Sequence, residues 1–202
     1  MNTNPDTKSK LDELLKNSPI TGAAYIPEKL NITNQKQMLR FTELLNIPGI
    51  TVVDQIKQQL KEFIKLSYPS KRLSDTELEA LAEKHIGQTP LWQYGCWFYY
   101  PWSNRLVHLL DEVEFVAVRT SRNQYKITPE EREILAGKKI GIVGLSVGQS
   151  VSVTLAMERI CGELRLADFD LLELTNLNRI RTGTQNLGLL KAHSVAREIA
   201  EL

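Results

Sequence analysis

Residues 138–170, KKIGIVGLSVGQSVSVTLAMERICGELRLADFD, contain two apolar runs separated by a segment with helical spacing. The first run, residues 138–145, is unbroken, which is typical of a strand buried on both faces of a parallel sheet. A helix is expected from near Gly148, and residues 163–170 then form a second strand that ends in acidic residues. The unit has about the thirty residues that a crossover between parallel strands requires. The stretch therefore predicts strand–helix–strand order in an α/β fold.

The turn between the first strand and the helix, GLSVGQ (residues 144–149), is a candidate phosphate loop. A dinucleotide-binding fingerprint has glycine at its first, third and sixth places, where this chain has Gly144, Ser146 and Gln149. Backbone N–H groups and the helix dipole attract phosphate at such a turn. We expect Ser146 to narrow the approach of a phosphate while adding a hydroxyl donor, and Gly148 to restore some flexibility. Gln149 is expected to crowd the strand–helix contact or to reach toward the ligand.

Composition excludes several classes of protein. The chain has 202 residues and a formal net charge of +1, so no global field attracts nucleic acid or a membrane surface. The cysteines, Cys96 and Cys161, form no CxxC pair and predict neither a zinc site nor a disulfide framework. We expect Cys161 to be a buried small apolar residue on the crossover helix. No apolar run is long enough to span a bilayer, and the N-terminus has no signal-peptide core, so a cytoplasmic protein is expected.

Residues 1–113 are expected to form a mainly helical accessory region, because apolar residues recur there at helical spacing between prolines. Asp54 is a candidate N-cap, and Ser74 with Glu77 has the pattern of a capping box. Residues 91–110 are rich in aromatic side chains. These side chains either pack the helical region against its neighbour or provide a stacking platform for a base or flavin ring.

Two further elements are expected before the first strand of the α/β unit. EFVAVRT (residues 114–120) has the composition of a strand. TPEEREILAGK (residues 128–138) predicts a short helix that Thr128 caps and Gly137 ends. The predicted domain boundary therefore falls between residues 113 and 114.

The segment after the second strand, DFDLLELTNLNRIRTGTQNLGLLKA (residues 168–192), resembles the signature of the ThiF/MoeB superfamily, the adenylating enzymes that include ubiquitin-activating enzymes. That signature has an acidic D-x-D, then S/T-N-L-x-R, then a V-G-x-x-K-like step into a helix. Here these elements are Asp168 and Asp170, residues 175–179, and residues 187–191. The resemblance extends over roughly residues 119–202 and identifies the chain as similar to a divergent bacterial ThiF-like protein.

The resemblance implies a fold and a ligand. Residues 114–202 would form the first strand–helix–strand–helix of a Rossmann-like ATP-binding domain, with ATP and Mg²⁺ as cofactors. Asp168 would bind the ribose, with Asp170 beside it, and the turn at Gly144, Ser146 and Gly148 would lie against the phosphates.

The resemblance also implies catalytic residues. Arg179 and Lys191 would bind the triphosphate, and Asn176 would help to shape that site. Two cations near the phosphates offset charge repulsion while a carboxylate attacks the α-phosphate and pyrophosphate leaves. The planar Arg179 guanidinium and the compact Lys191 ammonium would supply this charge in different geometries.

RTSRNQYKI (residues 119–127) is similar to the arginine-rich N-terminal segment of the family. In dimeric members an arginine there reaches into the partner subunit's ATP site. Arg119 and Arg122 are the candidates, and spacing favours Arg122, with simple surface arginines as the alternative. The resemblance thus implies a homodimer.

The C-terminal stretch LLKAHSVAREIAEL (residues 189–202) is amphipathic and then stops without a capping glycine. We therefore expect the chain to be the N-terminal part of a larger protein, with little turnover of its own. The magnesium ligand, and any catalytic cysteine or zinc-binding cysteines of the family, are expected beyond residue 202.

The full-length parent protein is expected to adenylate a carboxylate, either the C-terminus of a small ubiquitin-like or sulfur-carrier protein or a small-molecule acid. Two alternatives stay open. An NAD(P)-dependent oxidoreductase would use Gly144 and Asp168 but leaves Asn176, Arg179 and Lys191 without a role. A non-catalytic scaffold is favoured by the altered glycines and opposed by the retained Asp168, Arg179 and Lys191.

Overall fold

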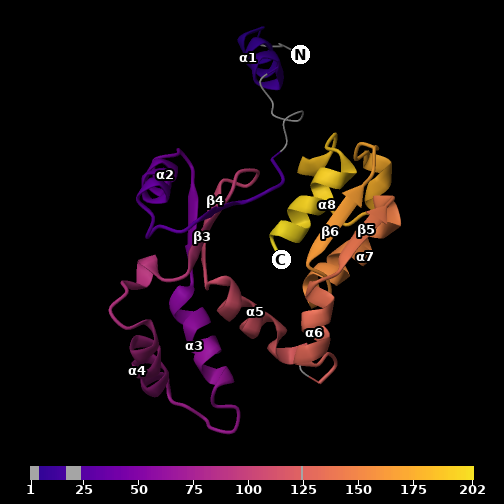
Figure 1. Cartoon of the computed structure of the whole chain (residues 1–202). Coiled ribbons are helices and arrows are strands. Elements are labelled where there is room, and N and C mark those ends of the chain that lie inside the picture. The colour runs from indigo at the N-terminus through magenta and orange to yellow at the C-terminus, as the bar shows by residue number, and fades with distance from the viewer. Residues whose placement is uncertain (1–4, 17–23, 124) are drawn as a thin grey trace.

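The computed structural model describes residues 5–123 and 125–202, apart from residues 17–23, and has a mixed α/β fold (Figure 1). Eight α-helices lie within these residues: α1 (Pro5–Lys16), α2 (Gln35–Leu45), α3 (Ile56–Leu66), α4 (Asp75–Ile86), α5 (Glu112–Thr120), α6 (Pro129–Ala136), α7 (Leu145–Glu158) and α8 (Lys191–Ala200). The strands are β1 (Glu28–Leu30), β2 (Thr51–Asp54), β3 (Cys96–Tyr100), β4 (Arg105–Leu109), β5 (Lys139–Val143) and β6 (Glu163–Ala167). No helix of the described residues is long and apolar enough to cross a membrane.

Besides the helices α1 to α4, the N-terminal region contains a four-stranded sheet that was not predicted from the sequence. The strands lie in the order β1-β3-β4-β2, with β3 antiparallel to both of its neighbours and β2 parallel to β4. The strands β1 and β2 have only three and four residues, too few for a period of two to stand out. In β3 the aromatic side chains alternate between the two faces of the sheet, which the aromatic composition alone did not reveal.

One face of this sheet forms a core with α2. Trp97 and Tyr99 of β3 pack there with Leu30 and Leu106, and α2 contributes Phe41. Trp97 is 4% exposed, and its indole Nε1 donates to the Trp92 carbonyl at 3.0 Å. Trp97 therefore has a packing role, but within the N-terminal region and not against the neighbouring region.

Residues 114–120 form part of helix α5, so the predicted strand is wrong. Asp111 caps the helix by accepting a hydrogen bond from the Glu114 N–H at 3.1 Å. Acidic residues lie in the first turn, where their negative charge interacts favourably with the helix dipole. Phe115 and Val118 pack against the core formed by α3 and α4. Tertiary packing therefore overrides the strand preference of Val and Phe, and the boundary at 113/114 falls inside α5.

The predicted capping box at Ser74 and the predicted N-cap at Thr128 are confirmed, and Thr128 also forms a capping box. Ser74 and Glu77 cap α4 reciprocally, and Thr128 and Glu131 do the same for α6. Helix α3 has Gln55 as its N-cap residue, and Asp54 ends β2 while its carboxylate accepts from the Ile56 N–H at 3.1 Å.

The C-terminal region has the predicted strand–helix–strand order. Strands β5 and β6 pair in parallel, from Lys139 opposite Glu163 to Val143 opposite Ala167, and α7 connects them. Helices α7 and α8 pack on this two-stranded sheet. The expectation of a fully buried β5 is wrong, because alternate residues of the strand are exposed and Val143 is 86% exposed.

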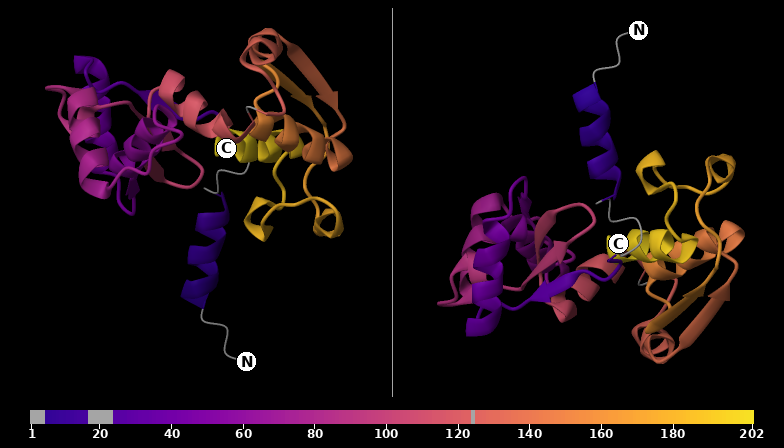
Figure 2. Two further views of the ribbon diagram at one scale, coloured as in Figure 1. Left: turned by 90° about the horizontal axis from the view of Figure 1, so that it is seen from below. Right: turned by 90° about the horizontal axis from the view of Figure 1, so that it is seen from above.

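Helix α8 lies between the two-stranded sheet and the N-terminal region (Figure 2). The Arg197 guanidinium donates to the Ala24 carbonyl at 2.8 Å, and the Trp102 indole donates to the Glu201 carboxylate at 2.5 Å. Tyr25 stacks on His193 with ring centroids 4.7 Å apart. Helix α1 stands apart from the other elements, with its Leu side chains exposed (Figures 1 and 2).

Candidate functional site

The turn after β5 begins at Gly144, whose φ of +86° lies in the left-handed region that favours glycine. Its N–H donates to the Ala167 carbonyl at the end of β6. Helix α7 begins at Leu145 rather than near Gly148, so Ser146 lies in the first turn of the helix and not in an open loop. The N-terminus of α7, with its unpaired N–H groups, thus lies at the carboxyl ends of both strands.

Asp168 directly follows β6 and bonds this helix end. Its Oδ2 accepts from the Leu145 N–H at 2.7 Å, and its Oδ1 accepts from the Asp170 N–H at 2.9 Å. Partial burial pushes the pKa of Asp168 upward, but the two backbone donors and the charge of Lys191 outweigh it, and the pKa is lowered. The carboxylate is therefore ionised at neutral pH, and its oxygens keep further acceptor capacity.

Lys191, the first residue of α8, contacts both the segment that follows β6 and the first turn of α7. Its side chain is 5% exposed, and Nζ lies 2.7 Å from Asp170 Oδ2 and 3.5 Å from Ser146 Oγ. The Lys191 backbone N–H also donates to the Asp170 carbonyl at 3.0 Å. An ammonium has three donors, so these contacts leave capacity for a further acceptor.

An open hollow of about 720 Å³ lies beside these groups. Gly144, Ser146, Asp168 and Asp170 line it, together with apolar residues that include the 92%-exposed ring of Phe169. A backbone turn, a hydroxyl, two carboxylates and a nearly buried ammonium therefore meet at one edge of the two-stranded sheet. The carboxylates can accept hydrogen bonds from ligand hydroxyl groups, and the N-terminus of α7 and the ammonium attract anions.

Three candidate residues lie elsewhere. Asn176 is buried in the short helix η4 (Leu174–Asn178), where its side-chain oxygen accepts from the Glu173 N–H at 3.0 Å. Arg179 is exposed, and its guanidinium bonds Asn178 Oδ1 at 3.0 Å within the same turn. Arg122 is exposed in η3 (Ser121–Asn123) and lines a different groove, beside α3 and α5.

Gly148 and Gln149 have structural roles that the sequence did not reveal. A Cβ atom at Gly148 would lie 2.7 Å from Ile142 Cγ2, so glycine there allows α7 to approach β5 closely. This corrects the expectation that Gly148 supplies flexibility. In the sequence, this packing role was indicated only by the presence of a glycine at position 148, one residue before the sixth position of the fingerprint.

The buried Gln149 amide joins three segments of the chain. Its Nε2 donates to the Arg181 carbonyl at 2.6 Å and to Glu198 Oε2 at 2.7 Å, and its Oε1 accepts from the Arg181 N–H at 3.0 Å. Gln149 therefore neither crowds the strand–helix contact nor lines the hollow. It ties α7 to the loop before η5 (Thr184–Asn186) and to α8.

The two cysteines are not placed for nucleophilic chemistry. Cys161 lies between α7 and β6 and is half-buried, which corrects its expected position on the helix. Burial raises the pKa of both the Cys96 and the Cys161 thiol, so both are protonated at neutral pH.

The sequence also did not predict two buried polar clusters in the N-terminal region. Glu114 Oε1 lies 2.6 Å from His85 Nε2 and accepts a hydrogen bond of 2.6 Å from the Tyr94 hydroxyl. His108, fully buried, lies 3.0 Å from Asp54 through Nδ1 and 2.6 Å from the Tyr94 carbonyl through Nε2. These partners are distant in sequence, so only the fold reveals them. Among the described residues, no group of three or more His, Cys, Asp or Glu side chains could hold a metal ion.

The fold and site define a mixed α/β protein with a polar hollow at the carboxyl ends of two parallel strands. No family model and no solved structure matches the chain. The chain is similar to the uncharacterized protein MT1398 of Mycobacterium tuberculosis (strain CDC 1551 / Oshkosh), with 51% identity over 106 residues. The match covers 52% of this chain and 15% of that protein, so the matched half of the chain corresponds to a small part of that protein's length.

Proposed function

We propose that this chain supplies the ribose- and phosphate-binding half of an ATP-dependent adenylyltransferase of the ThiF/MoeB type, within a Rossmann-like domain. The observation that supports this most is the position of Lys191. Its nearly buried ammonium lies between Asp170 and Ser146, beside the Gly144 turn. The resemblance of residues 168–192 to the family signature supports the same function.

In the proposed reaction, a substrate carboxylate attacks the α-phosphorus of ATP. The bond from that phosphorus to the bridging oxygen breaks, and pyrophosphate leaves. Lys191 would offset the negative charge of the phosphates, and the N–H groups at the start of α7 would bind phosphate oxygens. Asp168 would accept hydrogen bonds from the ribose hydroxyls through the acceptor capacity it retains.

The proposed acyl substrate is the C-terminus of a small carrier protein or a small-molecule acid. Mg²⁺ bound with ATP would supply further charge compensation, and we expect its protein ligand outside residues 1–202. Arg179 would have to leave its contact with Asn178 to reach the triphosphate.

ATP binding, measured by isothermal titration calorimetry, tests the proposal. Lys191→Met should weaken ATP binding at least about tenfold, because a hydrogen bond between charged groups is worth about 1.5–3 kcal/mol. Lys139→Met is the matched control, since Lys139 makes an ion pair with Glu163 at the opposite end of β5. NADH binding without ATP binding would favour the oxidoreductase, and binding of neither would favour the scaffold.

We also propose that the full-length protein is a homodimer in which the exposed Arg122 reaches the ATP site of the partner subunit. Arg122→Ala and Lys191→Met should each abolish adenylation alone. Mixed dimers of the two variants should regain activity, because one of their two sites has both residues. Failure of the mixture to regain activity, with dimers present in sedimentation, would contradict this role for Arg122.

A further inference from the structure

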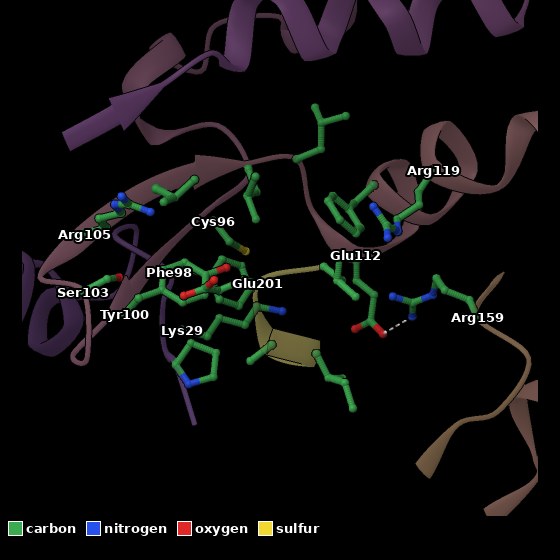
Figure 3. Close-up of a pocket in the computed structure, with 18 residues that line it drawn as sticks. Lys29, Cys96, Phe98, Tyr100, Ser103, Arg105, Glu112, Arg119, Arg159 and Glu201 are labelled. Atoms are coloured by element: carbon green, nitrogen blue, oxygen red, sulfur yellow. Dashed lines mark ion pairs between the residues drawn. The ribbon is translucent and has the colours of Figure 1, made fainter. Parts of the chain in front are cut away.

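A second cavity, of about 740 Å³, lies between the four-stranded sheet and the end of α8 (Figure 3). Strands β1, β3 and β4 form its floor, and α5 and the last residues of α8 close its sides. It shares no lining residue with the hollow at Gly144. It is therefore a separate candidate site.

The alternation of β3 explains why the floor is apolar. Trp97 and Tyr99 face the core with α2, so Cys96, Phe98 and Tyr100 face the cavity. Val107 and Leu109 of β4 extend this floor, and Phe115 of α5 and Ile199 of α8 face it. The Cys96 thiol has a raised pKa because it is desolvated, and it contributes to the wall as a protonated, largely apolar group.

The charged side chains around this floor are mainly cationic. Glu112 and Glu201 are the acidic side chains of the lining, against four basic ones: Lys29, Arg105, Arg119 and Arg159. The Trp102 indole donates a hydrogen bond to the Glu201 carboxylate. The Glu112 carboxylate lies 4.0 Å from the Arg159 guanidinium (Figure 3). With two carboxylates against four cations, the side chains of the lining carry an excess of two positive charges.

Two of the guanidinium groups have no partner among the described residues. Within the described part of the chain, Arg105 and Arg119 form no side-chain hydrogen bond or ion pair, and both line the cavity. Lys29 lies over the Phe98 ring, with Nζ 5.9 Å from the centroid. Guanidinium groups pair readily with carboxylates, and the Lys29 ammonium adds a third cation beside the apolar floor.

We propose that this cavity binds a small organic anion with a flat apolar body, of the class of aromatic carboxylates. The ring of the ligand packs over Phe98 and Val107, and its carboxylate pairs with Arg119 or Arg105. Because the site combines positive charge with an apolar floor, it should bind an aromatic carboxylate more tightly than a neutral aromatic ligand or an inorganic anion. This site does not depend on the proposed ATP site, so either can fail without the other.

Calorimetric titration of the chain with naphthalene-2-carboxylate tests this proposal. One molecule should bind per chain, and naphthalene-2-carboxamide, which has the same ring without the charge, should bind at least about tenfold more weakly. Inorganic phosphate should bind at least as weakly as the carboxamide. Equal binding of acid and amide, tighter binding of phosphate, or no binding of the acid would overturn the proposal.

Variants locate the site. Arg119→Gln and Arg105→Gln together should reduce the affinity for the carboxylate at least about tenfold, and unchanged thermal melting would show that they fold. Arg72→Gln is the matched control, because Arg72 is exposed and lies in the loop between α3 and α4. An equal loss in Arg72→Gln, or full affinity in the double variant, would contradict binding in this cavity.

Discussion

At position 149, where a dinucleotide fingerprint has glycine, this chain has a buried glutamine that bonds both the N–H and the carbonyl of Arg181. At position 148 it has a glycine that allows α7 to approach Ile142. The close strand–helix contact of the fingerprint is thus provided one residue earlier, and residue 149 is free to take another role. The residues at these two positions are therefore explained by their contacts within the fold and not by contact with a phosphate.

Gln149→Met keeps the side-chain volume but removes all three hydrogen bonds. Because the Arg181 backbone groups then lose their partner, we expect the free energy of unfolding to fall by about 1–3 kcal/mol. Urea denaturation followed by circular dichroism measures this change. Gln58→Met, at an exposed position of α3, should leave stability nearly unchanged. Similar losses in both variants would contradict the role of Gln149.

Gly148→Val should destabilise the protein by about 1–3 kcal/mol, because the added carbons overlap Ile142 and force α7 away from β5. Ser150→Val places the same β-branched residue at an exposed position of the same helix and controls for helix propensity. The difference between their denaturation midpoints isolates the packing effect. Equal midpoints would show that α7 does not need glycine at position 148.

At the scale of single elements, local signals predicted some structure correctly and failed where long-range contacts decide. The capping box at Ser74, the N-cap at Thr128 and the β5–α7–β6 order follow from neighbouring residues, and the structure has them. Helix α5 depends on packing against α3 and α4, and β1 and β2 exist only through pairing with distant strands. No local pattern contains that information.

The capping box of α4 predicts a pH dependence. Hydrogen bonds from the Ser74 backbone and hydroxyl, and then Lys71, lower the pKa of Glu77 from 4.5 to about 2. A carboxylate with a lowered folded-state pKa stabilises the protein above its unfolded pKa, and this contribution is lost as pH falls toward the folded-state value.

Wild type should therefore melt at a higher temperature than Glu77→Gln at pH 6, and the difference should shrink between pH 4.5 and about pH 2. Thermal melts of both proteins across this range measure it. Glu62→Gln, at an exposed position of α3, is the control and should show no such trend. A constant difference between wild type and Glu77→Gln would contradict the assignment.

At the scale of the whole molecule, α8 is the element that connects the parts. Its first residue, Lys191, bonds Asp170 beside the hollow, while Arg197 and the adjacent Glu201 bond the N-terminal region. The sequence predicted the helix and the meeting of Gly144, Ser146, Asp168, Asp170 and Lys191. It did not predict the contacts of α8 with the sheet or the second cavity, because both require the four-stranded sheet that local patterns did not reveal.

The most direct test of the proposed function is ATP–pyrophosphate exchange by the full-length protein in the presence of its acyl substrate. Wild type and Lys139→Met should exchange label at equal rates. Lys191→Met and Arg179→Ala should each lower the rate at least about a hundredfold, since both cations would stabilise the transition state. Equal exchange in wild type and Lys191→Met, or no exchange by wild type with any carboxylate tested, would contradict the account.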